Sequence, residues 1–259
     1  MIEYLFLGCF VGICAGMFGI GGGGIMVPVF TMIFLENSVN EPLHLALGSS
    51  MCAIIITSFS SFKAHNKNHA VRWDIFKFMA PGVVVGTMSS AFVASIIPAF
   101  YLALIFSLYM FIQALRMFFA TVTTKASKVY KRGVQFIAGA IIGAVSAIVS
   151  IGGGSLSVPY VASQGVDIKK AIGTSAAIGF PLSIAGTLGY IISGWQNTDI
   201  ANFIVGYVNL KAVFFTTITS FLFAPLGVMI VHHIKSSIAR KIFGVFLFAL
   251  SINMFLKFI

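Results

Sequence analysis

Charged residues are scarce in this chain. Only 8% of its 259 residues are charged, and only six are acidic, whereas 59% are apolar and the mean hydropathy is +1.03. About a quarter of the residues in an ordinary water-soluble domain are charged, so the composition excludes that class of protein. We expect an all-α polytopic membrane protein.

Acidic side chains are missing from the middle of every apolar segment. The six acids stand at segment ends or in loops: Glu3, Glu36, Glu41, Asp74, Asp167 and Asp199. A proton relay through carboxylates inside the membrane is therefore not expected. The remaining titratable candidates are five histidines near segment ends, for which we expect interfacial or solvated positions: His44, His65, His69, His232 and His233.

Basic residues outnumber acidic ones and give a net charge of +10. They gather in loops, which is the pattern of positive-inside anchoring in a membrane. No soluble domain is visible that could present a basic face to nucleic acid, so nucleic acid is not an expected partner. The lipid bilayer is an expected partner, and we expect a multi-pass location in a bacterial inner (plasma) membrane.

Cysteine is also rare, and the motifs of two competing classes are missing. Cys9, Cys14 and Cys52 all lie in apolar stretches without metal-ligand spacing, so they are expected to be packing residues. The chain has no Gly-x-Ser-x-Gly motif of a serine hydrolase and no Gly-x-x-x-x-Gly-Lys-Ser/Thr loop of an ATP-driven pump. We therefore expect neither an enzyme nor a bound metal or cofactor.

Apolar segments of membrane-spanning length follow one another along the chain. The most polar stretch near the middle carries Lys125, Lys128, Lys131 and Arg132 and divides these segments into four and four. We predict a first half over residues 1–120, a basic cytoplasmic linker over 121–133 and a second half over 134–259. The eight segments cover about residues 4–35, 43–62, 75–97, 99–120, 134–162, 171–193, 204–231 and 240–258.

The two halves repeat one another. The nine residues from Ile20 to Pro28, IGGGGIMVP, recur from Ile151 to Pro159 as IGGGSLSVP, identical at six of nine positions. Two further echoes follow in order, Ala-Leu-Gly-Ser-Ser against Ala-Ile-Gly-Thr-Ser and Ala-Pro against Ala-Pro, and they begin at Ala46, Ala171, Ala80 and Ala224. An internal duplication of this kind is typical of secondary transporters.

A run of glycines interrupts the first and fifth segments. In the first, the stretches before and after the run would give helical limbs of about 22 Å and 16 Å, which together exceed the hydrocarbon thickness of about 30 Å. Each segment is therefore either a tilted, broken helix or a re-entrant hairpin. Re-entry of both would bring Lys63, Lys67, Arg72, Lys169 and Lys170 to one side, as the positive-inside rule favours.

Glycine runs at membrane depth need protein or a cavity to satisfy their backbone. Several N–H groups can converge there on one ligand, and the limb that follows points its positive dipole end at the same place, so an anion suits the site. Pro28 and Pro159 are expected in the first turn of the limbs, where a missing N–H breaks no helical bond. Neighbouring hydroxyls would complete the site. The candidate ligands are Gly21, Gly22, Gly23, Gly24, Ser49, Ser50, Gly152, Gly153, Gly154, Ser155, Thr174 and Ser175.

These motifs resemble the TauE/SafE sulfite exporter family, also called the 4-toluene sulfonate uptake permease family. The resemblance rests on the two glycine runs ending in Val-Pro, the Ala-x-Gly-Ser/Thr-Ser motif and the sequence GYVNL from Gly206, and it covers nearly the whole chain. It implies a secondary transporter whose substrate is a small sulfur-containing or carboxylate anion such as sulfite, a sulfonate or sulfoacetate.

An anion channel is the main alternative to a carrier, because broken helices that meet at the bilayer midplane also build selectivity filters. The direction of transport and the coupling ion stay open at this stage. So does the oligomeric state, with a homodimer as one possibility.

Overall fold

Ten α-helices make up nearly all of the part of the chain that the structure describes, which agrees with the predicted all-α membrane fold. The structure is a computed structural model, and it describes residues 2–18, 22–119, 130–233 and 236–258. The helices are α1 (Ile2–Phe18), α2 (Gly23–Glu36), α3 (Pro42–Lys67), α4 (Trp73–Ile96), α5 (Ala99–Phe119), α6 (Arg132–Ile148), α7 (Gly154–Ala162), α8 (Ile168–Ser193), α9 (Leu210–His233) and α10 (Ser236–Phe258).

Five helices among the described residues are long and apolar enough to cross a membrane: α3, α4, α5, α8 and the Lys241–Phe258 part of α10. A sixth helix, α9, has 24 residues and a similar composition. At 1.5 Å per residue, each of these six exceeds or approaches the hydrocarbon thickness of about 30 Å. The chain is therefore a multi-pass membrane protein.

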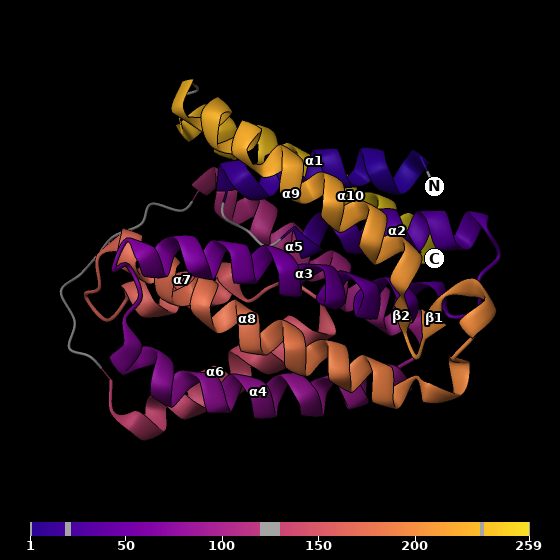
Figure 1. The fold of residues 1–259 in the computed structure, drawn as a ribbon, viewed down its shortest axis with the longest axis horizontal. Coiled ribbons are helices and arrows are strands. Elements are labelled where there is room, and N and C mark those ends of the chain that lie inside the picture. Colours follow the sequence, from indigo (N-terminus) through magenta and orange to yellow (C-terminus); the bar gives the residue numbers. More distant parts are fainter. Residues whose placement is uncertain (1, 19–21, 120–129, 234–235, 259) are drawn as a thin grey trace.

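The first and fifth apolar segments are hairpins and not crossings. The start of α1 and the end of α2 reach the same end of the molecule, where Glu3, Tyr4 and Asn37 line one cavity. In the second half, Gln135 near the start of α6 donates from Nε2 to Oε1 of Gln164, just after α7, over 2.5 Å. The two hairpins enter from opposite ends, so the re-entrant alternative is confirmed and eight plain crossings are excluded (Figure 1).

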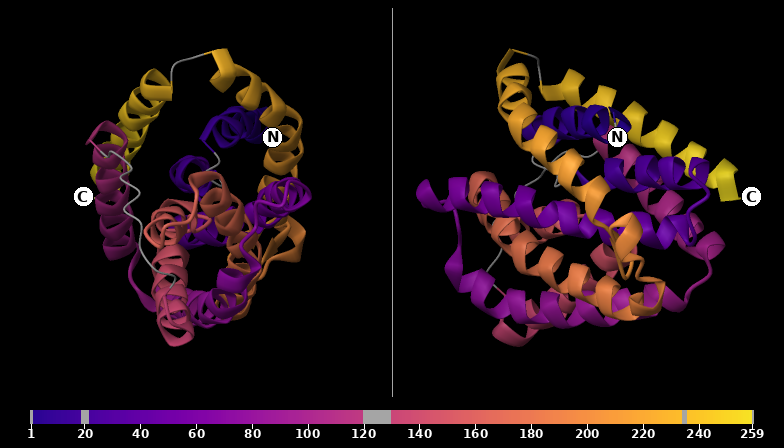
Figure 2. Two further views of the ribbon diagram at one scale, coloured as in Figure 1. Left: turned by 90° about the vertical axis from the view of Figure 1, so that its left-hand side faces the viewer. Right: turned by 45° about the vertical axis from the view of Figure 1, so that its right-hand side comes forward.

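Helices of the two halves interleave. In Figures 1 and 2, α1 lies along α9, α6 along α4, α3 along α8 and α5 along α10, and each of these pairs is in extensive contact. Glycines allow the close crossings: a Cβ added at Gly12 would lie 2.4 Å from the Ser220 oxygen, and one added at Gly143 would lie 2.4 Å from the Val83 oxygen. The proposed boundary over 121–133 stays a prediction, because residues 120–129 lie outside the described part of the chain.

Basic residues predominate at one end of the molecule and acidic residues at the other, with Asp74 and Asp167 at the basic end and Lys211 at the acidic end as exceptions. The basic end holds the end of α3, the 68–72 turn and the starts of α6 and α8, with Lys63, Lys67, Arg72, Arg132, Lys169 and Lys170. The acidic end holds the start of α1, the end of α10 and a short antiparallel hairpin of β1 (Ile204–Val205) and β2 (Val208–Asn209), with Glu3, Glu36, Glu41 and Asp199 (Figure 1). This hairpin lies where the sequence predicts the start of the seventh apolar segment (204–231). The helix of that segment, α9, begins instead at Leu210.

Candidate functional site

The two glycine loops meet in the interior of the molecule. Gly22 precedes α2 with φ 73°, and Gly153 precedes α7 with φ 74°, so equivalent glycines adopt the same left-handed conformation. The loops touch directly, since a Cβ added at Gly23 would lie 2.2 Å from the oxygen of Ser150. Gly21, also a predicted ligand, lies outside the described residues.

This contact places two helix N-termini close together. Helix α2 runs from the loops toward the acidic end, and α7 runs from the loops toward the basic end (Figure 1). The first-turn N–H groups of each helix have no intrahelical acceptor, and each N-terminus carries about half a positive charge. Two such ends that face one region create a positive potential there without any charged side chain. That is a suitable environment for an anion.

Pro28 and Pro159 lie deeper in the helices than the sequence suggests. They are the sixth residues of α2 and α7, so the first-turn prediction is wrong. Proline has no N–H to donate to the carbonyl four residues earlier, which leaves the carbonyls of Gly24 and Ser155 without their usual helical partner. The backbone next to the loops therefore also offers acceptors.

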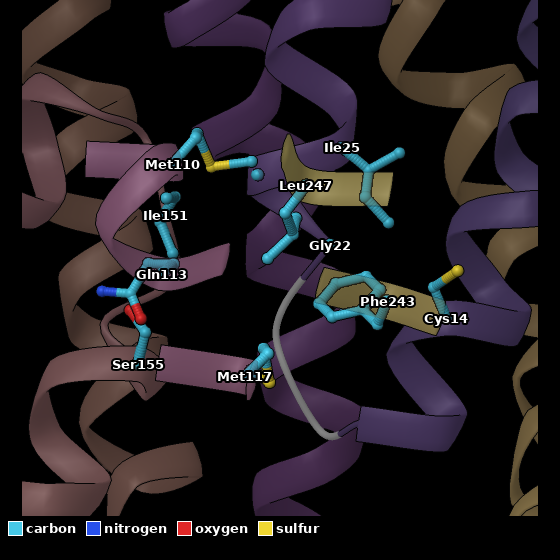
Figure 3. A pocket seen from close by; sticks show the side chains of 11 residues that line it. Cys14, Gly22, Ile25, Met110, Gln113, Met117, Ile151, Ser155, Phe243 and Leu247 are labelled. Atoms are coloured by element: carbon cyan, nitrogen blue, oxygen red, sulfur yellow. The ribbon is translucent and has the colours of Figure 1, made fainter. Parts of the chain in front are cut away.

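A small apolar cavity of about 30 Å³ lies on one side of the loops (Figure 3). Met110, Phe243 and Leu247 form much of its wall, and Gly22 and Gly24 border it. Its polar groups come from Gln113 and from Ser155, whose hydroxyl pairs with the Tyr109 hydroxyl. We call this space the apolar cavity.

A second cavity, of about 40 Å³, also borders the loops and is lined by hydroxyl groups. We call it the hydroxyl cavity. Gly152 and Gly154 supply its backbone wall, and Ile54, Ala176 and Gly179 close it. At 10–15 Å³ for each water, it has room for about three waters or one very small anion. Its hydroxyls come from α3 and α8: Thr57, Ser58, Ser61 and Ser175.

Not all predicted hydroxyl ligands face a cavity. Ser49 accepts a hydrogen bond from the Asn209 N–H over 2.8 Å, and Thr174 accepts one from the Arg72 N–H over 2.9 Å. Both side chains are fully buried. They occupy equivalent positions in the two halves and fasten the turns before α9 and α4, so their role in the structure is packing between the halves.

The remaining predicted hydroxyls lie nearer the loops. Ser50 donates to the Ser150 carbonyl over 3.4 Å and so fixes the loop that touches Gly23. Ser175 pairs with Ser157 of α7 over 2.6 Å. No sequence pattern singles out Thr57, Ser58 and Ser61, because hydroxyls on an apolar helix are common. Only the packing of α3 against α8 brings them to the cavity.

His44 differs from the expectation of a solvated histidine. It is only 3% exposed, and its ring stacks on Tyr207 with centroids 5.2 Å apart. The side chain turns inward because Nε2 finds two carbonyl acceptors at the end of α4, those of Ala94 and Ile97. The Glu-x-x-His spacing from Glu41, which places the two residues three positions apart at the start of a helix, was the available sequence signal.

An open polar depression of about 700 Å³ lies at the acidic end. We call it the vestibule. It is bordered by the 37–40 turn and the 196–211 segment, and Tyr207 connects it to His44. Among the described residues, no group of three His, Cys, Asp or Glu side chains could hold a metal ion.

Comparison with known proteins agrees with this architecture. The model of the family described as "Sulfite exporter TauE/SafE" matches residues 4–254. A probable membrane transporter protein of Haemophilus influenzae is 34% identical over 98% of this chain and 97% of its own length. Probable membrane transporter proteins of Methanocaldococcus jannaschii and Bacillus subtilis (YdhB) are each 27% identical, over 87% and 71% of this chain and 84% and 76% of their own lengths.

No solved structure matches the chain. The family match spans nearly all of the sequence, and the relatives named here are described as probable membrane transporter proteins. The chain therefore belongs to the TauE/SafE sulfite exporter family and is a membrane transporter.

Proposed function

We propose that this transporter is a secondary carrier of small sulfur-containing anions such as sulfite, in a bacterial inner membrane. The observation that carries the proposal is the meeting of the α2 and α7 N-termini at Gly23 and Ser150. Among the described residues, those that line the two cavities beside this contact carry no charged side chain. Backbone amides and hydroxyls would therefore bind the anion, and they can do so without a counter-charge that slows its release.

The hydroxyl cavity is the better candidate for the bound anion. Four hydroxyl side chains line this cavity, whereas the apolar cavity offers one amide and one hydroxyl. Its size favours a compact oxyanion over a bulky aromatic sulfonate. Larger sulfonates would need the glycine loops to move apart, and the apolar cavity would then supply room for a short carbon chain.

The test is ligand-dependent thermal stabilisation of the purified protein in detergent. Sulfite, sulfate, taurine, sulfoacetate, isethionate and small carboxylates would be compared at equal ionic strength. At a ligand concentration of 100 times Kd, stabilisation of about 2.7 kcal/mol is expected. Stabilisation by a carboxylate alone would instead favour a transporter of small carboxylates.

Ser61→Ala and Ser175→Ala are the informative variants, because each removes a hydroxyl from the cavity and leaves the glycines of both loops unsubstituted. We expect both to lose most of the stabilisation by the anion that binds the wild type. Ser163→Ala is the matched control, since Ser163 is exposed just beyond the other end of α7. Full retention of the shift in both cavity variants would contradict the assignment.

Flux measurements in proteoliposomes separate a carrier from a channel. Saturable flux with counter-transport of labelled anion would support the carrier. Single-channel conductance in planar bilayers would overturn it in favour of an anion channel.

A further inference from the structure

His44 has an oxygen atom beside each of its two ring nitrogens. Nε2 lies 3.2 Å from the Ala94 carbonyl oxygen and 3.1 Å from that of Ile97. Nδ1 lies 2.8 Å from Oε2 of Glu41, at ion-pair distance, and makes no aligned hydrogen bond with the rest of the described chain. The imidazole therefore joins the start of α3 to the end of α4.

These contacts fix where the protons must be. A carbonyl oxygen only accepts, so Nε2 has to carry a hydrogen. A bare Nδ1 would then point its lone pair at a carboxylate oxygen 2.8 Å away, which is repulsive. The arrangement is stable only when one additional proton lies between Nδ1 and Oε2, either on His44 or shared with Glu41.

Glu41 is held in an unusual conformation at this contact. It is the N-cap of α3 with φ 50° and ψ 53°, a left-handed conformation that is unfavourable for a residue with a Cβ. Its carboxylate makes no capping bond to α3 and reaches His44 instead. Half of the Glu41 side chain is exposed, so a proton at this pair can exchange with water.

The pair controls a junction of three segments. Its ring holds the end of α4 through two carbonyls and stacks on Tyr207, whose backbone oxygen lies against Gly48 of α3. Tyr207 also lines the vestibule. Because burial and the Glu41 charge both raise the pKa of Tyr207, its phenol stays protonated and does not supply the proton.

Other ionisable residues at this end do not contact His44. Glu36 of α2, Asp199 of the 194–209 segment and Lys211 of α9 have no interaction with its ring in the described structure. Neither α8 nor α5 carries a charged residue at this end. Within the described part of the chain, Glu41 is thus the one charged group found in direct contact with the imidazole.

We infer that Glu41 and His44 form a proton-binding site whose occupancy holds the acidic end of the transporter closed. With the proton bound, His44 keeps α3, α4 and Tyr207 together. When the proton leaves to the vestibule, the carboxylate and the Nδ1 lone pair repel each other and the junction loosens. Proton binding from this side thereby becomes linked to closure of the acidic end, and proton release becomes linked to its opening.

Hydrogen–deuterium exchange of the full-length purified protein tests the junction without any substrate. Exchange in peptides that cover 94–97 and 204–209 would be measured at pH 6 and pH 9 and corrected for intrinsic rates. We expect these peptides to exchange faster at pH 9, by up to about fivefold, since a partly exposed ion pair rarely contributes more. In Glu41→Gln the difference between the two pH values should disappear.

Controls separate this site from other charges. Glu36→Gln removes an exposed acid at the same end, and His69→Asn removes an exposed histidine at the opposite end, where asparagine tolerates the φ of 51°. Both should keep the wild-type pH response. The same response in Glu41→Gln as in the wild type would overturn the inference.

Nitrogen-15 NMR of histidine-labelled protein gives a second readout. At pH 7 the wild type should show a histidine with both ring nitrogens protonated, and this signal should be absent from His44→Gln and changed in Glu41→Gln. If His44→Gln does not fold, the Glu41→Gln spectrum alone decides. That variant is expected to fold, because the Glu41 side chain is half exposed. A wild-type spectrum with only neutral histidines at pH 7 would refute the proton-binding site.

Discussion

The Ser58 hydroxyl lies 3.4 Å from the Ser183 hydroxyl, and the two residues occupy equivalent positions in the two halves. Each stands ten residues after the glycine of its motif, Gly48 in one half and Gly173 in the other. The pair therefore lies close to the axis that relates the halves, where α3 and α8 face each other beside the hydroxyl cavity.

Removal of either serine of this pair should cost little stability. In the structure each hydroxyl also donates to a backbone carbonyl, that of Ile55 for Ser58 and that of Phe180 for Ser183. The remaining serine therefore keeps a hydrogen bond when its partner is replaced. We expect Ser58→Ala and Ser183→Ala each to lower the free energy of unfolding by about 1 kcal/mol. Thermal melts of the single and double variants would show a double-variant loss smaller than the sum, since both changes remove the same contact. Strict additivity would argue that the hydroxyls do not interact.

The hairpin topology predicts which positions share a side of the membrane. Single cysteines at Lys67 and Lys169 should react with a membrane-impermeant maleimide from the same side, although a chain with eight crossings would place them on opposite sides. Cysteines at Asn37 and Asp199 should react only from the other side. A background without Cys9, Cys14 and Cys52 is needed. Labelling of Lys67→Cys and Lys169→Cys from different sides would contradict the fold.

Two adjacent glycines should respond differently to alanine. At Gly23 a methyl group would meet the Ser150 oxygen at 2.2 Å, so the two loops would have to separate. We expect Gly23→Ala to cost at least about 2 kcal/mol and to reduce the yield of folded protein. At Gly24 the nearest atom is the flexible end of Met110 at 3.2 Å, so Gly24→Ala should fold with a loss below about 1 kcal/mol. Size-exclusion profiles and melting temperatures in detergent measure both, and equal behaviour would contradict the described loop contact.

Gly22 and Gly153 are less useful as probes of binding. Both have φ values above 70°, so alanine at either position strains the backbone whether or not an anion binds there. Loss of ligand stabilisation in such variants would have two explanations. Hydroxyl variants in the cavity avoid this ambiguity.

Composition and repetition alone determined much about this protein. A chain with 59% apolar and 8% charged residues has too few charges to cover a soluble surface, and its apolar runs of spanning length favour a membrane protein with helical spans. The duplicated glycine runs located the breaks in the first and fifth segments, because consecutive glycines disfavour a continuous helix. The family resemblance rested on those same runs, and the match over residues 4–254 confirms it.

Tertiary structure decided what local pattern leaves open. Loop charge favoured hairpins, but the contact of Gln135 with Gln164 and the shared vestibule of Tyr4 and Asn37 established them. The repeated motif predicted Ser49 and Thr174 as site residues, yet their hydroxyl oxygens accept hydrogen bonds from backbone N–H groups of the opposite half. Likewise, His44 lies near a segment end, where an interfacial or solvated side chain was expected. Two carbonyls 50 and 53 positions away in the chain turned it inward, and contacts at such separations leave no periodic trace in a sequence.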